Sequence, residues 1–145
     1  MCSSDLLRSP YLPGIRPFKA QPTFQSCCTE PNAQGEYPLP TEFLVPGFTV
    51  APTVRPQDMS LKLVQSNLQQ TCGPLRWITN SAVCGGLRSD LLRAIASQQR
   101  DRSAAVSSLR TFLSELEANH GPGKPVTDNA YWLLKVNVEY LLKQM

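Results

Sequence analysis

The stretch SAAVSSLRTFLSELEA, residues 103–118, decides the fold of the C-terminal part of this chain. Its apolar residues recur every three or four positions, which places them on one face of a helix. This stripe consists of Val106, Leu109, Phe112, Leu113 and Leu116. Ser103 suits the N-cap, and Gly121-Pro122-Gly123 ends the helix near Asn119. The pattern predicts an amphipathic helix that must bury one face against neighbouring helices.

Two further helices are expected before this one. Residues 57–71 follow a proline that suits a first turn, carry apolar side chains at helical spacing and end before Gly73-Pro74. A connection is expected over residues 72–86, closed by Gly85-Gly86. The helical spacing then resumes over residues 87–100.

A last helix is expected from Asp128 to about Lys143. Thr127 suits its N-cap, and Asp128 lies at the positive end of the helix dipole. The helix is apolar on nearly all sides, which predicts either a central position in the bundle or a face that meets the N-terminal arm or a partner. Short connections between the helices favour antiparallel neighbours.

Prolines separate this helical part from the N-terminal part. All but three of the 13 prolines precede residue 57, and the exceptions are Pro74, Pro122 and Pro125. Because proline lacks an N–H and holds the preceding residue extended, residues 1–56 are expected to form no helix. They carry many aromatic and aliphatic residues, which flexible linkers lack. We therefore expect an arm along a surface, with residues 42–50 as an isolated extended segment; plain disorder is the alternative.

These patterns predict an all-α fold class, a small bundle of three to four helices preceded by an extended proline-rich arm. The arm comprises residues 1–56 and has no independent fold. The helical bundle domain comprises residues 57–145. A chain of 145 residues has room for one domain.

The cysteine count is odd, so the chain cannot pair all its cysteines internally. Cys72 and Cys84 bracket a short loop and are the candidate disulfide, with two partly buried thiols as the alternative. Cys27-Cys28 lacks the further ligands that a zinc site needs. Cys2, before two serines, would suit the lipidated end of a mature lipoprotein.

Several functional classes have little support. The net charge of +3 is spread without a basic cluster, which argues against nucleic acid as a partner. No apolar run predicts a transmembrane helix, and the first residues lack the apolar stretch of a signal peptide. The single histidine, His120, has no nucleophile or carboxylate in a local motif. The sequence therefore predicts no enzyme, no cofactor and no metal site.

Three motifs resemble those of the FIMAH domain family. Residues 86–92, GLRSDLL, resemble its GL-x-x-x-LL opening; residues 104–118 resemble its A-x-x-x-L-x-x-F helix; and residues 123–130, GKPVTDNA, resemble its GK-x-[LI]-T cap. The resemblance covers about residues 58–145. It implies a small helical module in secreted or surface-exposed bacterial and archaeal proteins, with no established activity and no functional residues to carry over. A proline-rich arm stands here where such proteins usually have a large partner domain.

The leading hypothesis is a non-catalytic structural or interaction protein in an extracellular or cell-surface assembly. Its partner would be another protein or a second copy of itself, contacted by the apolar arm, for example through strand addition to a sheet. The candidate partner-binding residues are aromatic or aliphatic: Phe43, Leu44, Val45, Phe48, Val50, Trp77, Tyr131 and Trp132.

Two alternatives stay open. A module that binds a glycan or a cell-wall polymer would use the rings of Trp77, Tyr131 and Trp132 as platforms. An intracellular subunit of a large complex would keep all five cysteines reduced.

Overall fold

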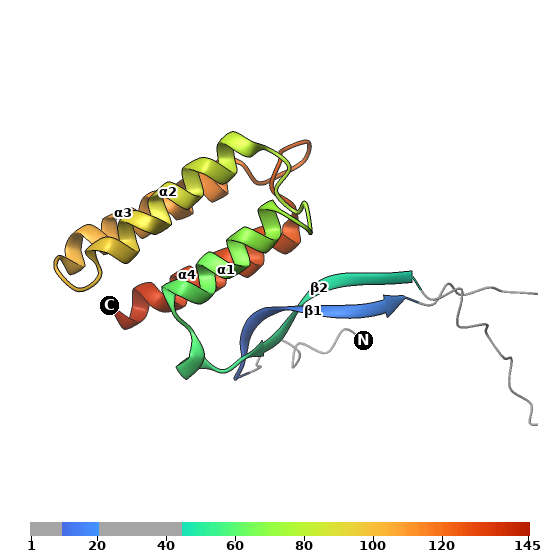
Figure 1. Ribbon diagram of the computed structural model, residues 1–145, viewed down its shortest axis with the longest axis horizontal. Coiled ribbons are helices and arrows are strands. Elements are labelled where there is room, and N and C mark those ends of the chain that lie inside the picture. The colour runs from blue at the N-terminus through green and yellow to red at the C-terminus, as the bar shows by residue number, and fades with distance from the viewer. Residues whose placement is uncertain (1–9, 21–44) are drawn as a thin grey trace, which may run out of the picture.

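The computed structural model describes residues 10–20 and 45–145. Within them, two strands come first and four α-helices follow (Figure 1). The strands are β1 (Leu12–Ala20) and β2 (Val45–Val54), and a 3₁₀ turn at Pro56–Asp58 leads into the helices. The helices are α1 (Leu61–Cys72), α2 (Ser81–Ser97), α3 (Arg102–Ala118) and α4 (Asp128–Gln144).

The predicted all-α class is wrong, because β1 and β2 form an antiparallel two-stranded sheet beside the bundle (Figure 1). The predicted isolated segment over residues 42–50 is also wrong where the structure describes it. Residues 45–50 pair along β1, with Ile15 opposite Val50 and Phe18 opposite Gly47. The proline-rich arm therefore contains regular structure. β1 and β2 are separated in the sequence by residues 21–44. The spacing of apolar residues within either strand therefore could not predict that the two strands pair.

The prolines are compatible with this pairing because of their register. Partners in an antiparallel ladder alternate between pairs that exchange hydrogen bonds and pairs that do not. Pro13 lies opposite Pro52, Pro17 opposite Phe48, and Lys19 opposite Pro46. These pairs are an even number of positions apart along the ladder, so they are all of the same hydrogen-bonding type. Since proline cannot donate, these are the pairs without hydrogen bonds, and each missing N–H faces an outer edge of the sheet. Prolines on both outer edges hinder pairing with another strand.

Polar side chains cap the helices and set their starts. The predicted cap of α4 is confirmed, since the hydroxyl of Thr127 accepts from the Ala130 N–H. α2 begins at Ser81 rather than Leu87, because the Asn80 side chain accepts from two backbone N–H groups of the first turn. Asp101, rather than Ser103, caps α3. Ser60 caps α1, which therefore begins after the 3₁₀ turn instead of within it.

Gly85-Gly86 lies inside α2 instead of closing a loop. A Cβ on Gly86 would overlap the carboxylate of Glu115 from α3. The glycine therefore allows α2 and α3 to pack closely, with a glutamate side chain against the α2 backbone.

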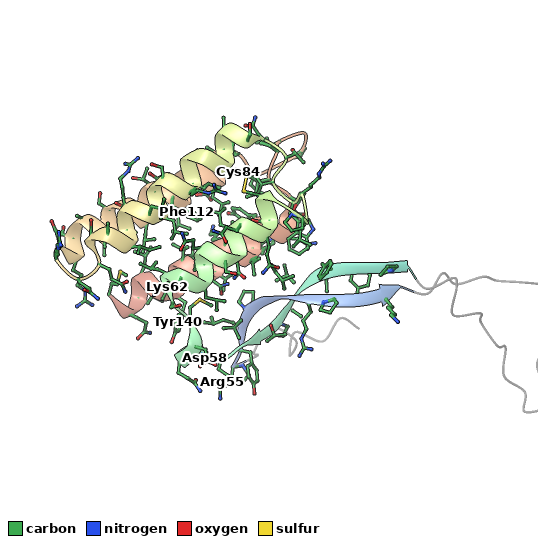
Figure 2. All side chains as sticks on the ribbon, viewed as in Figure 1. Arg55, Asp58, Lys62, Cys84, Phe112 and Tyr140 are labelled. Carbon is green, nitrogen blue, oxygen red and sulfur yellow. A yellow bond between two sulfur atoms is a disulfide. The ribbon has the colours of Figure 1, made fainter. Side chains whose placement is uncertain are left out.

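The hydrophobic core lies between the four helices, and Phe112 is fully buried within it (Figure 2). α4 contacts α1, α3 and both strands, as its apolar composition predicts. Leu12 and Val54, at the base of the hairpin, pack against this core, and the Asn137 amide donates to the Pro13 carbonyl at 3.0 Å. The base of the hairpin is thus held on α4, while its outer half extends beyond the bundle (Figure 1).

Candidate interaction site

The structure places the predicted partner-binding residues in two separate regions. Phe48 and Val50 belong to β2, whereas Tyr131 and Trp132 belong to α4. Trp77 lies in the connection between α1 and α2. Phe43 and Leu44 fall outside the described residues, and the side chain of Val45 is not described.

A first hollow of about 330 Å³ lies in the corner between the hairpin and the bundle. It brings together Phe48 from β2 and Trp77, which are distant in sequence. The other lining residues come from the end of α1 and the following turn: Gln70, Pro74 and Leu75. We call this hollow the corner. Phe48 and Trp77 were both predicted as partner-binding residues, but their sequence positions did not indicate that they lie together.

The backbone after α1 explains how Trp77 reaches the corner. Arg76 has φ 50, a left-handed conformation that turns the chain sharply after Gly73-Pro74. The next residues pair with the connection between α3 and α4. The Thr79 N–H donates to the Pro125 carbonyl at 3.0 Å, and the Thr127 N–H donates to the Trp77 carbonyl at 2.9 Å. These two connections therefore support each other and hold the tryptophan in place.

A second hollow, of about 440 Å³, lies at the outer end of the hairpin. Phe48 lines both hollows and is 50% exposed, and Phe18 is 43% exposed. The Phe18 ring covers Gly47 on the opposite strand, where a Cβ would lie 2.7 Å from the ring. Cross-strand partners share a face, and successive residues of a strand alternate between faces. Phe18 lies opposite Gly47, the neighbour of Phe48, so the two rings lie on opposite faces of the hairpin. The hairpin thus presents apolar surface on both sides.

The charges around these hollows are positive. Lys19 lines the outer hollow, and no carboxylate of residues 10–20 or 45–145 lines either of them. Arg16 is exposed on the same strand face as Phe18, and Arg76 is exposed next to Trp77. A ligand that presents carboxylates beside its apolar groups would be favoured here.

In the second region, on α4, the polar and aromatic groups of Tyr131 already have partners within the protein. Tyr131 is only 5% exposed, and the His120 ring stacks on it with ring centroids 3.8 Å apart. The Tyr131 hydroxyl donates to Glu117 and accepts a hydrogen bond from Lys135 at 2.8 Å. This hydrogen bond from Lys135 is the main cause that raises the lysine's pKa, with the Glu117 charge adding to it. His120 also forms a short pair with Asp128 at 2.7 Å, a partner that lies outside any local motif.

Trp132 is the exposed member of this region, with 53% of its surface accessible. Its ring meets Tyr131 edge-on, and the Lys135 ammonium lies 6.0 Å from its centroid. Tyr131 offers no free face beside it, since His120 covers one side. The aromatic residues in the described part of the chain therefore do not form the flat platform of two neighbouring rings that glycan binding would need.

A carboxyl pair lies between α2 and α3 that no local pattern predicted. Asp90 is 3% exposed and faces Glu115 from the next helix. Burial raises the pKa of Glu115, and the charge and hydrogen bond of Asp90 raise it further. Arg93 lies 3.4 Å from Asp90 and offsets part of the charge. Among the described residues, no group of three or more His, Cys, Asp or Glu side chains is arranged to hold a metal ion.

The predicted disulfide between Cys72 and Cys84 is confirmed, and it joins the end of α1 to the first turn of α2 (Figure 2). None of the helices in residues 45–145 is long and apolar enough to cross a membrane. Comparison of the chain with protein-family models, curated proteins and solved structures finds no match. The resemblance to the FIMAH family therefore stays a prediction that rests on its three motifs.

Proposed function

We propose that this chain is a protein-interaction module that binds an extended apolar segment of a partner in the corner. The observation that carries the proposal is Phe48, which is half exposed yet forms a wall of both hollows. A large apolar side chain that stays half exposed beside a hollow is a candidate binding hot spot. The partner segment would carry acidic residues that face Lys19 and Arg76.

Side-chain docking is favoured over strand addition. The inner edge of β2 already pairs with β1. Its outer edge lacks donors at Pro46 and Pro52, so a further strand would lose hydrogen bonds there. An extended segment would instead lie between the rings of Phe48 and Trp77, as proline-rich ligands do in aromatic-lined grooves.

An extracellular or cell-surface location is part of this proposal. Disulfides persist mainly in oxidising compartments, and the Cys72–Cys84 bond supports such a location over a reducing cytosol. The FIMAH-like motifs favour the same setting. The glycan-binding alternative has less support, because none of the described residues places a second exposed ring beside Trp132.

The test is selection of random 12-residue peptides from a display library on the oxidised, full-length chain. We expect enrichment of apolar peptides that carry Asp or Glu, with affinities lost on Phe48→Ser. Leu92→Ser is the matched control, because Leu92 is 46% exposed on α2 and lines neither hollow. Selected peptides that bind the Phe48→Ser variant as well as the wild type would overturn the proposal, as would a failure to enrich any peptide.

A further inference from the structure

A third hollow, of about 370 Å³, lies beside the disulfide. Cys72 and Cys84 both line it, together with the polar residues Thr79, Ser81 and Arg88. Its volume is at the lower end of the range of small-molecule sites, about 300–1,000 Å³. A small thiol therefore has room to enter the hollow that the two cysteines line.

Both cysteines of the bond are partly accessible. Cys72 and Cys84 are half-buried rather than enclosed in the core. Each is followed by a glycine that lines the hollow, Gly73 and Gly85. A Cβ on Gly85 would meet no atom within 4 Å, which shows free space next to Cys84.

The two sulfur atoms lie in opposite electrostatic environments. Cys84 is in the first turn of α2, where the positive end of the helix dipole stabilises a thiolate. Arg88 lies one turn further along and lines the same hollow, and its side chain has no ion pair among the described residues. Cys72 is the last residue of α1, where the negative end of the dipole disfavours a thiolate. Cys84 is therefore the better leaving group.

We propose that Cys72–Cys84 is an exchangeable disulfide that reacts with small anionic thiols in this hollow. The incoming thiolate attacks Cys72 Sγ, the Sγ–Sγ bond breaks, and Cys84 leaves as a thiolate beside Arg88. A second thiolate then attacks the incoming sulfur of the mixed disulfide, releases Cys72 as a thiolate that takes a proton from water, and forms a small-molecule disulfide. Two thiols are oxidised for each protein disulfide reduced. The carboxylate or sulfonate of the thiol pairs with Arg88.

Exchange would also affect the corner, a consequence that rests on the proposed function. The connection between the two cysteines carries Pro74, Leu75 and Trp77, which form one wall of the corner. Reduction removes the covalent tie across this connection and leaves its hydrogen bonds to the other connection. Peptide binding is then expected to weaken on reduction.

The experiment measures reduction of the full-length chain after its free thiols are blocked with N-ethylmaleimide. The reductants are 2-mercaptoethanesulfonate, which is anionic, and 2-mercaptoethanol, which is neutral, compared at equal thiolate concentration. Newly freed cysteines are alkylated and read by peptide mass spectrometry, so the peptides with Cys72 and Cys84 are followed individually. We expect rates proportional to thiol concentration and a trapped mixed disulfide on Cys72. Arg88→Gln should lower the rate ratio of the anionic to the neutral thiol roughly three- to tenfold.

Arg110→Gln is the control, because it removes the same charge from an exposed position on α3 that does not line the hollow. A reduction rate independent of thiol concentration would show that the bond opens only through unfolding, and would overturn the proposal. A mixed disulfide on Cys84, or a rate ratio that Arg88→Gln leaves unchanged, would also overturn it. If exchange occurs while peptide binding stays the same, only the link to the corner fails. If exchange fails, peptide binding by the oxidised chain is unaffected.

Discussion

The bundle and the outer hairpin use their aromatic residues in opposite ways. Phe112 is fully buried among the helices, whereas Phe18 and Phe48 are 43% and 50% exposed. Burial of a phenylalanine side chain stabilises a fold by about 1.5–3 kcal/mol, which the two exposed rings largely forgo. Stability therefore comes mainly from the bundle, while the outer hairpin presents apolar surface that the other described residues leave uncovered.

The largest expected effect separates the two regions directly. Phe112→Ala removes a fully buried ring and leaves a cavity, so it should lower the free energy of unfolding by about 3–5 kcal/mol. Phe48→Ala should change it by less than about 1 kcal/mol, because the ring is half exposed. Urea denaturation followed by circular dichroism measures both. Similar losses for the two variants would mean that the outer hairpin belongs to the stabilising core.

Deletion of residues 1–56 tests how far the bundle stands alone. The hairpin contributes Leu12 and Val54 to the edge of the core, and both are only partly buried. We expect a folded helical domain with a free energy of unfolding lower by about 2–3 kcal/mol. The far-ultraviolet spectrum and the urea midpoint of the truncated chain report this. A truncated chain without a cooperative transition would contradict the separation of the two regions.

Asn137→Ala tests the attachment between them. It removes the hydrogen bond to the Pro13 carbonyl, and a loss of about 1 kcal/mol is expected. The loss stays small because the Asn137 Oδ1 is buried without a partner among the described residues, so the substitution also removes an unsatisfied group. Hydrogen exchange should become faster in β1 and β2 and stay the same in α3. If hydrogen exchange became equally faster in all elements, the substitution would destabilise the whole fold and not only the attachment of the hairpin.

The smallest expected effect lies inside the bundle, at Glu115. Its folded-state pKa is raised, first by burial and then by Asp90, so the ionised carboxylate is disfavoured in the fold. Below the ordinary glutamate pKa both states are protonated and nothing is lost. As the pH rises from there through the raised folded pKa, the free energy of unfolding falls. Glu115→Gln should flatten this part of the pH profile, and Glu139→Gln on α4 is the control. An unchanged slope in Glu115→Gln would assign the pH dependence to another group.

Periodicity predicted well where structure depends on near neighbours. The stripe on α3 and the Thr127 cap involve residues three or four positions apart, and the two cysteines that pair are 12 positions apart. It failed at α2, where Gly85-Gly86 indicates a break. The Asn80 cap and the packing of Glu115 onto Gly86 outweigh the poor helix propensity of two glycines.

The candidate site was predicted only in part. Phe48 and Trp77 were recognised as apolar residues available to a partner, but the corner arises only because β2 passes the end of α1. Tyr131 and Trp132 are neighbouring aromatic residues that the sequence does not distinguish, yet Tyr131 is buried under His120. Exposure depends on which neighbours fold over a ring, and those neighbours lie on different elements.

Local sequence patterns alone predict the helical periodicity, the Thr127 cap of α4 and the two cysteines that pair. These follow from short-range sterics and hydrogen bonds along one chain segment. The tertiary structure alone decided that the proline-rich strands pair, that their missing donors face outward, and that Phe48 meets Trp77. Each of these depends on a register or a contact between distant segments, and such contacts form only when the whole core closes around them.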